Sequence, residues 1–134
     1  MKTLVVEDDF VNRQILVKML DAFGSCDVAG NGREALEAFT LGHQEGKPYD
    51  LICLDILMPL MDGQNVLSVI RTKESHMRIT HRQSAKIIMI SALQDRGNII
   101  QAFKTGCESY LVKPVEKEKL VEEIRKLGLL DPVY

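Results

Sequence analysis

An aspartate follows an uninterrupted apolar run near the middle of the chain, where its position favours chemistry over packing. Residues 51–54 carry no polar alternation, which predicts a β-strand buried on both faces. Asp55 follows directly, and Pro59 prevents the strand from continuing far beyond it. A buried carboxylate without a partner is costly, so we expect Asp55 to emerge at the edge of a sheet. Asp55 is therefore the first candidate for a reactive group.

Other polar residues stand at the ends of other apolar runs. Asp8 and Asp9 follow the first run, Ser91 ends a later one, and Lys113 follows the last. Because parallel strands present their carboxyl ends at one edge of a sheet, these residues should converge on Asp55.

Such a group of side chains favours phosphoryl chemistry assisted by a metal. Three carboxylates repel one another, and Lys113 compensates only one charge, so a hard cation is expected. Few protein ligands with open positions for water favour Mg²⁺ over a full Ca²⁺ cage. With both cations present, Asp55 could attack phosphorus and form an acyl phosphate, while Ser91 bonds a phosphoryl oxygen.

The elements that must position these residues alternate strictly between strand and helix. This alternation predicts an α/β fold with a doubly wound, five-stranded parallel sheet in the order 2-1-3-4-5, which is flavodoxin-like. We expect one domain over residues 1–128 and a short tail over 129–134. The strands are expected at residues 3–6, 26–29, 51–54, 86–91 and 109–112; the helices at 11–23, 31–42, from 62, 95–106 and around 120–127.

The segment between the third helix and the fourth strand is less regular. Residues 73–85 lose apolar periodicity and are expected to form a long surface loop or a frayed extension of the helix. The slightly longer stretch 71–86 is basic, which fits either an ordinary solvated surface or a contact with a specific partner.

Composition excludes several classes of function. The 134 residues are 46% apolar and 27% charged, with a net charge of -2, so neither nucleic acid nor membrane is expected as a partner. No apolar run approaches the ~20 residues of a membrane span, and the first residues do not read as a signal peptide. The cysteines, Cys26, Cys53 and Cys107, are odd in number and lack metal-site spacing, which predicts reduced thiols and a cytoplasmic location.

Four separated motifs resemble the receiver domain of two-component response regulators. The resemblance covers nearly the whole chain and is to the single-domain, CheY-like members. The motifs are Glu7-Asp8-Asp9; Leu54-Asp55-Ile56-Leu57-Met58-Pro59 with Met61-Asp62-Gly63; Ser91-Ala92; and Tyr110-Leu111-Val112-Lys113-Pro114.

The resemblance implies specific roles for the acids. Asp55 would accept a phosphoryl group from a histidine kinase or a phosphotransfer protein. Asp9, Asp55 and the Leu57 carbonyl would bind Mg²⁺ directly, and Asp8 would act through water. The alternative for Asp9 alone is a helix N-cap.

The resemblance also implies a switch. Ser91 and Tyr110 would form the switch pair, although Tyr110 could equally be a half-buried core aromatic, and Lys113 would contact the phosphoryl group. An effector protein would bind the face formed by the helix after Asp95, the strand 109–112 and the last helix. The protein would be a monomer or a phosphorylation-dependent dimer.

Two other functions compete with a signalling switch. A Mg²⁺-dependent phosphohydrolase with an aspartate nucleophile would use a second acid two residues after the nucleophile, where this chain has Leu57. A flavodoxin-like cofactor carrier is disfavoured, because the first turn after residue 6 is acidic and has no glycine. We therefore expect a phosphoacceptor regulator that only assists its own phosphorylation and dephosphorylation.

Overall fold

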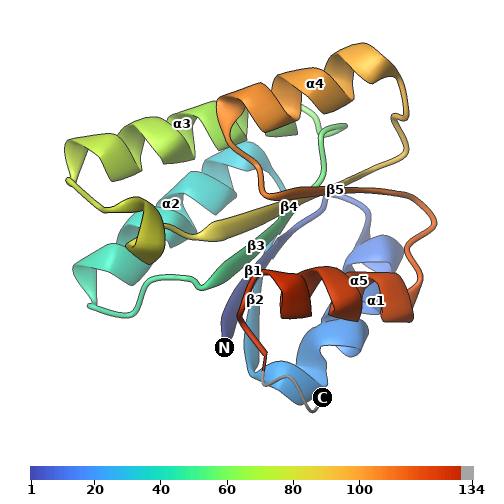
Figure 1. Ribbon diagram of the computed structural model, residues 1–134, viewed down its shortest axis with the longest axis horizontal. Helices are drawn as coiled ribbons and strands as arrows, with labels where there is room; N and C mark the ends of the chain where they lie inside the picture. Colours follow the sequence, from blue (N-terminus) through green and yellow to red (C-terminus); the bar gives the residue numbers. More distant parts are fainter. Residues whose placement is uncertain (131–134) are drawn as a thin grey trace.

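Residues 1–130, which the computed structural model describes, contain one parallel β-sheet of five strands (Figure 1). The strands are β1 (Lys2–Val6), β2 (Ser25–Ala29), β3 (Leu51–Leu54), β4 (Lys86–Ser91) and β5 (Ser109–Val112). They lie in the order β2-β1-β3-β4-β5, and every neighbouring pair is parallel. The predicted doubly wound order is confirmed.

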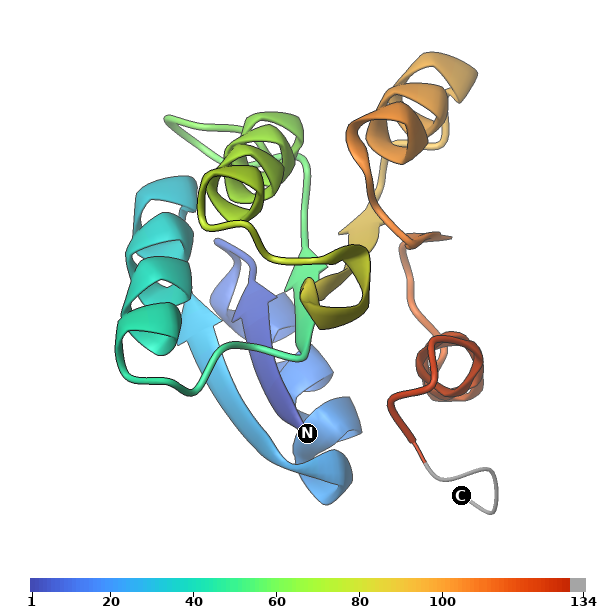
Figure 2. The ribbon, with the colours of Figure 1, turned by 60° about the vertical axis from the view of Figure 1, so that its left-hand side comes forward.

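Helices cover both faces of the sheet. Within residues 1–130 the α-helices are α1 (Phe10–Leu20), α2 (Gly32–Gln44), α3 (Gly63–His76), α4 (Arg96–Thr105) and α5 (Lys117–Lys126), with short 3₁₀ helices at Asp21–Phe23 and His81–Gln83. The helices α1 and α5 pack on one face, and α2, α3 and α4 pack on the other (Figure 2).

The apolar run of β3 is buried on both faces, as its sequence predicts. Leu51 and Cys53 pack with α1 and α5, whereas Ile52 and Leu54 pack with α2 and α3. Since successive residues of a strand point to opposite faces, only a run without polar alternation can serve two apolar layers.

Side-chain caps define where the helices begin. Asn31, Asp62 and Asp95 each accept a hydrogen bond from the backbone N–H three residues further on, which satisfies a donor that the helix leaves free. At the other end, Gly106 follows α4 with φ of +126°, a conformation that favours glycine. These positions agree with the helix starts at 31, 62 and 95 and the helix end at 106 that the sequence predicts.

The irregular segment 73–85 is a helical extension followed by a loop. The helix α3 continues to His76, and residues 81–83 form a 3₁₀ helix. The helix continues because Glu74 is buried rather than solvated: its carboxylate bonds the Arg71 guanidinium at 2.6 Å and the Ala85 N–H at 2.8 Å.

Two further sequence predictions concern residues remote from the strand ends. The cysteines are free thiols, and burial raises the pKa of Cys53 to about 12 and that of Cys107 to about 11. Leu129 and Leu130, at the start of the expected tail, pack against the α1 and α5 side of the core, and residues 131–134 lie outside the described residues.

No helix within residues 1–130 is long and apolar enough to cross a membrane.

Arg71 links three segments at the end of the sheet away from Asp55. Besides Glu74, it bonds both carboxylate oxygens of Glu108 at 2.8 and 2.9 Å, and it donates to the carbonyls of Ala85 and Gly106. Burial raises the pKa of Glu108, and the Arg71 charge and the Ile87 N–H oppose that rise. Arg71 therefore makes it possible to bury two carboxylates.

Arg71→Ala should destabilise the protein by about 3–5 kcal/mol at neutral pH, because it leaves two buried carboxylates uncompensated. Without the Arg71 charge the pKa of Glu108 in the folded state would rise further, so the deficit should shrink as the pH falls and Glu108 takes up a proton. Urea unfolding at pH 7.5 and pH 5 measures both effects.

The matched control is Arg33→Ala, which removes a solvent-exposed pair with Glu37 and should change stability little. Equal deficits for the Arg71 variant at the two pH values would show that the buried charges do not determine its cost.

Candidate functional site

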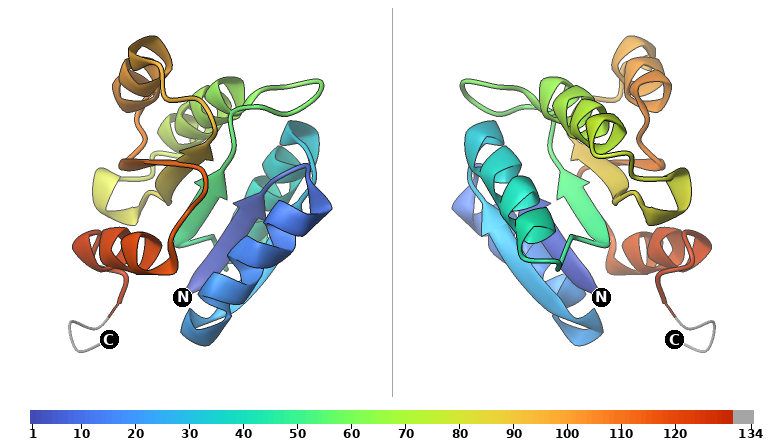
Figure 3. Two further views of the ribbon diagram at one scale, coloured as in Figure 1. Left: turned by 90° about the vertical axis from the view of Figure 1, so that its right-hand side faces the viewer. Right: turned by 90° about the vertical axis from the view of Figure 1, so that its left-hand side faces the viewer.

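The register of the central strands places Glu7 opposite Asp55. Val6 pairs with Leu54, and the Asp55 N–H donates to the Val6 carbonyl at 3.1 Å. The next residue on each strand therefore lies at the carboxyl edge of the sheet, opposite the edge where the chain begins (Figure 3). The two acids point to the same face, since paired residues of parallel strands share one.

Lys113 follows the edge strand β5, and its side chain bonds both of these acids. Its Nζ lies 2.5 Å from Glu7 Oε1 and 2.8 Å from Asp55 Oδ2. It follows β5, where its N–H donates to the Ser91 carbonyl, and the Lys113-Pro114 peptide is cis. The structure thus brings Asp55 and Lys113 together, as the sequence predicts.

Burial makes this charge cluster electrostatically strong. The Glu7 side chain is 1% exposed and that of Asp55 is 6% exposed. Desolvation raises the pKa of Glu7, the hydrogen bond from Lys113 opposes the rise, and the Asp55 charge adds to it. Burial would lower the pKa of Lys113, but its bonds to Asp55 and Glu7 raise it overall. The lysine is held as a cation between two anions.

Asp8 completes an acidic group, whereas Asp9 does not. One carboxylate oxygen from each of Glu7, Asp8 and Asp55 lies within 4.8 Å of the others, and Asp8 is exposed to solvent. Asp9 instead accepts a hydrogen bond from the Asn12 N–H at 3.1 Å and caps α1. The acids that the structure brings together are therefore Glu7, Asp8 and Asp55.

Sequence reasoning quoted Glu7 in a motif but gave it no role. The signal was available in the strand pairing: Glu7 is the residue that directly follows β1, as Asp55 directly follows β3. In a parallel pair those two positions are neighbours, while Asp9 is two residues further along and is free to start a helix.

The donor set fits a hard divalent cation. Carboxylate oxygens are ligands that Mg²⁺ prefers, and the exposed Asp8 leaves the group open to water. The Leu57 N–H donates to Asp55 Oδ1 at 3.1 Å, which turns this segment back toward the acid. A role for the Leu57 carbonyl in metal binding stays a prediction.

Ser91 and Tyr110 meet at the peptide groups of Leu93. Ser91 is fully buried, and its Oγ accepts from the Leu93 N–H at 3.2 Å. The Tyr110 hydroxyl donates to the Leu93 carbonyl at 2.7 Å, and burial raises its pKa. Both side chains thus hold the start of the loop between β4 and α4, an arrangement that could couple them.

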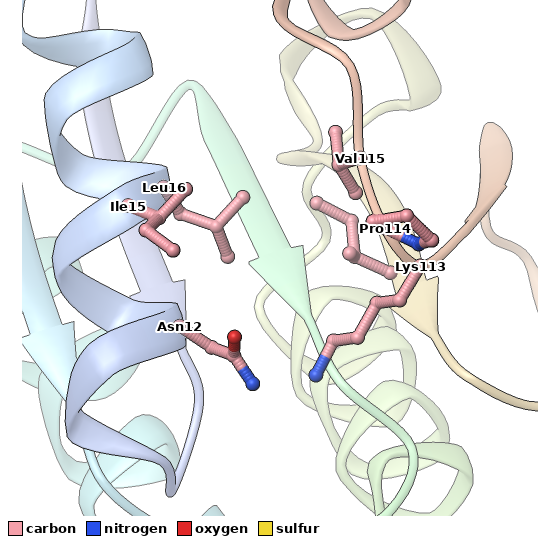
Figure 4. A pocket seen from close by; sticks show the side chains of 7 residues that line it. Asn12, Ile15, Leu16, Lys113, Pro114 and Val115 are labelled. Atoms are coloured by element: carbon pink, nitrogen blue, oxygen red, sulfur yellow. The ribbon is translucent and has the colours of Figure 1, made fainter.

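An apolar groove of about 440 Å³ adjoins Lys113. Figure 4 shows Ile15 and Leu16 of α1 on one side and Pro114 and Val115 on the other. Around the acids, further apolar side chains are exposed, namely Phe10, Leu57 and Leu60. The groove and the acidic group therefore adjoin each other at Lys113, which lines the groove and bonds two of the acids.

Comparison with known proteins identifies the family. Residues 3–125 match the response regulator receiver domain. The chain belongs to that family. The receiver domain is a phosphorylation-dependent signalling switch of two-component systems, and this chain has its fold and its acidic pocket.

Individual relatives have the same fold or sequence over most of this chain. It is 32% identical to the chemotaxis protein CheY of Listeria monocytogenes over 126 residues, which cover 94% of this chain and 98% of that protein. It is 35% identical over 129 residues to hybrid signal transduction histidine kinase L of Dictyostelium discoideum, covering 95% of this chain and 7% of that protein. The receiver domain is similar in structure to a chain in the CheX-CheY-BeF₃-Mg²⁺ complex of Borrelia burgdorferi, with a TM-score of 0.83 and 26% identity over 96% of this chain and 89% of that one.

Lys113→Met should raise the pKa of Glu7 further, because Lys113 now lowers it by a hydrogen bond and by its charge. Carbon-13 NMR of the Glu7 carboxyl group, followed against pH without metal, measures the shift. Lys126→Met, which changes a solvent-exposed lysine on α5, is the control. An unchanged titration curve for Glu7 in the Lys113 variant would contradict the proximity of the two charges.

Proposed function

We propose that Asp55 is the phosphoacceptor of this receiver domain. The single observation that supports this most strongly is the position of its carboxylate: at the sheet edge, bonded to the Lys113 ammonium, within one acidic group with Glu7 and Asp8. Glu7 shares the lysine and the acidic group, but of the two only Asp55 stands in the 54–59 motif that resembles the phosphoacceptor segment of receiver domains.

The reaction forms one bond and breaks one. A carboxylate oxygen of Asp55 attacks phosphorus, and the bond from phosphorus to the nitrogen of a donor phosphohistidine breaks, with its electron pair leaving on that nitrogen. With acetyl phosphate the leaving atom is oxygen. Lys113 already contacts Asp55 and neutralises charge on the phosphoryl oxygens, while Ser91 keeps a hydroxyl proton that can be donated.

Mg²⁺ is the cation that we assign to the acidic group. Glu7, Asp8 and Asp55 would hold it, and it would supply charge neutralisation for the incoming phosphoryl oxygens. This assignment replaces Asp9, whose carboxylate is engaged in capping α1. The Borrelia burgdorferi complex with a similar chain contains Mg²⁺ and beryllofluoride, which supports the choice of ion.

A regulator fits this site better than a phosphohydrolase. Leu57, two residues after Asp55, has an exposed side chain that cannot transfer a proton. The site thus has a nucleophile, Asp55, and a cation, Lys113. At position 57 it has no side chain that could donate a proton to the leaving group. We infer that the protein only assists its own phosphorylation and dephosphorylation.

Partners follow from this role. The donor would be a sensor histidine kinase or a phosphotransfer protein, docking on the apolar surface around the acids; one relative is itself a hybrid histidine kinase. The effector would bind α4, β5 and α5, where Ile100 and Phe103 are exposed. We also propose a cytoplasmic location, where such donors act, and a monomer or a phosphorylation-dependent dimer.

Acetyl phosphate with Mg²⁺ should add one base-labile phosphoryl group, and Asp55→Asn should abolish it. The Mg²⁺ concentration for half-maximal labelling should rise at least about tenfold in Asp8→Asn, because a charged ligand is lost. Asp9→Asn is the matched control: asparagine also caps helices, so its Mg²⁺ dependence should match the native protein.

Two outcomes would contradict the assignment. Undiminished labelling of the Asp55 variant would exclude Asp55 as acceptor. If the Mg²⁺ concentration for half-maximal labelling rises more in the Asp9 variant than in the Asp8 variant, Asp9 is the metal ligand.

The phosphorylated state should be long-lived, because leucines occupy the positions two residues after Asp55 and after Ser91. Hydrolysis needs water in line with the bond to Asp55, and neither Leu57 nor Leu93 can orient it. Leu57→Asn and Leu93→Glu should each speed decay about tenfold or more, since positioned polar groups commonly contribute at least that much.

Decay of the labelled protein in Mg²⁺ is the measurement, with Leu41→Asn on α2 as an exposed control. If the native protein loses phosphate as fast as the two polar variants, Leu57 and Leu93 do not set the lifetime.

A further inference from the structure

Gln64 joins two helices that lie side by side on the same face of the sheet (Figure 2). It stands in the first turn of α3 and is 6% exposed. Its Nε2 donates to the Asn98 carbonyl of α4 at 2.8 Å and lies 3.4 Å from Asn98 Oδ1. A buried glutamine is uncommon in an α-helix that faces a core, so this contact needs an explanation.

The α3 side of this contact is fixed to the phosphoacceptor strand. The Gly63 N–H donates to the Ile56 carbonyl at 2.9 Å. The approach is so close that a Cβ on Gly63 would lie 2.1 Å from the Asp55 carbonyl oxygen. The first turn of α3 is therefore in direct contact with the backbone of Asp55 and Ile56.

The α4 side is held much less firmly. In α4 only Ala102 is buried, and Gly97 weakens the first turn because glycine is a poor helix former. Asn98 itself is tied to the cap of its own helix: its N–H and its side-chain amide both donate to Asp95 at 3.0 Å. A bond to Asn98 therefore holds the whole N-terminal turn of α4.

The other end of the Gln64 amide has no partner. Its Oε1 is buried and makes no hydrogen bond within residues 1–130. An unsatisfied buried acceptor lowers stability, whereas an apolar side chain of similar size would leave none. Gln64 thus gains a directional bond to α4 at a cost to stability, which indicates that positioning is its role.

We propose that Gln64 is a positioning residue that holds α4 in the arrangement observed, so that breaking its bond to Asn98 is part of the cost of switching. The inference rests on phosphorylation at Asp55, and it deepens that function by naming the contact that resists the response. Ser91 and Tyr110 act on Leu93, which lies three residues before α4 begins. A change at Leu93 can reposition α4 only against the anchor at Gln64.

Linkage makes this testable, because weakening a contact specific to one state strengthens binding to the other. Gln64→Leu removes the donor and the unsatisfied acceptor together. It should tighten the binding of beryllofluoride with Mg²⁺ between about two- and tenfold, the range expected for one hydrogen bond. Backbone amides of α4 should exchange faster by a similar factor without ligand, and stability to urea should not fall.

Gln101→Leu, which changes an exposed glutamine on α4, is the control and should alter neither quantity. Gln64→Met repeats the test with a flexible side chain should leucine pack poorly. NMR titration with beryllofluoride and hydrogen exchange of α4 provide the readouts.

The proposal is overturned if the Gln64 variants bind beryllofluoride no more tightly than the native protein does. It is also overturned if hydrogen exchange in α4 is unchanged. Failure of the underlying function has a different signature: the native protein itself would not bind beryllofluoride at Asp55.

Discussion

The Lys113 ammonium, held between the carboxylates of Glu7 and Asp55, is the interaction on which the rest of the site depends. Two carboxylates this deeply buried would repel each other without a counter-charge. The lysine supplies that charge and leaves their free oxygens, with Asp8, for a metal. In the proposed role of Asp55 as phosphoacceptor, the nucleophile would already have its neutralising charge beside it, which lowers the reorganisation that phosphoryl transfer needs.

The parallel arrangement of the strands makes this charge cluster possible. Glu7, Asp55 and Lys113 follow three different strands, and only a parallel sheet brings the ends of β1, β3 and β5 to one edge. The side chains of β3 pack into the apolar cores on both faces of the sheet, and this packing holds the strand that ends at Asp55 in place. Ser91 of β4 and Tyr110 of β5 both bond the backbone of Leu93, at the start of the loop that leads to α4.

Much of this could be predicted because it depends on local pattern. Strand-helix alternation determines the sheet order, and residues such as Asp62 and Asp95 mark helix starts by their own hydrogen bonds. A run of three acids does not by itself distinguish Glu7 from Asp9; the distinction requires comparing where β1 and β3 end, at residues 6 and 54. The burial of Glu74 was equally hidden, since its partner atoms come from Arg71 and from Ala85, eleven residues away. Local signals fix elements, whereas contacts between elements decide which charged residues are buried.

The most direct test of the central claim is a crystal structure of the protein with Mg²⁺ and beryllofluoride. The account predicts beryllium bonded to a carboxylate oxygen of Asp55, Lys113 in contact with a fluorine, and Mg²⁺ bound by Asp55 together with Asp8 or Glu7. Asp9 should remain the cap of α1. Beryllofluoride on another residue, or Mg²⁺ bound by Asp9 with Glu7 and Asp8 uninvolved, would contradict the account.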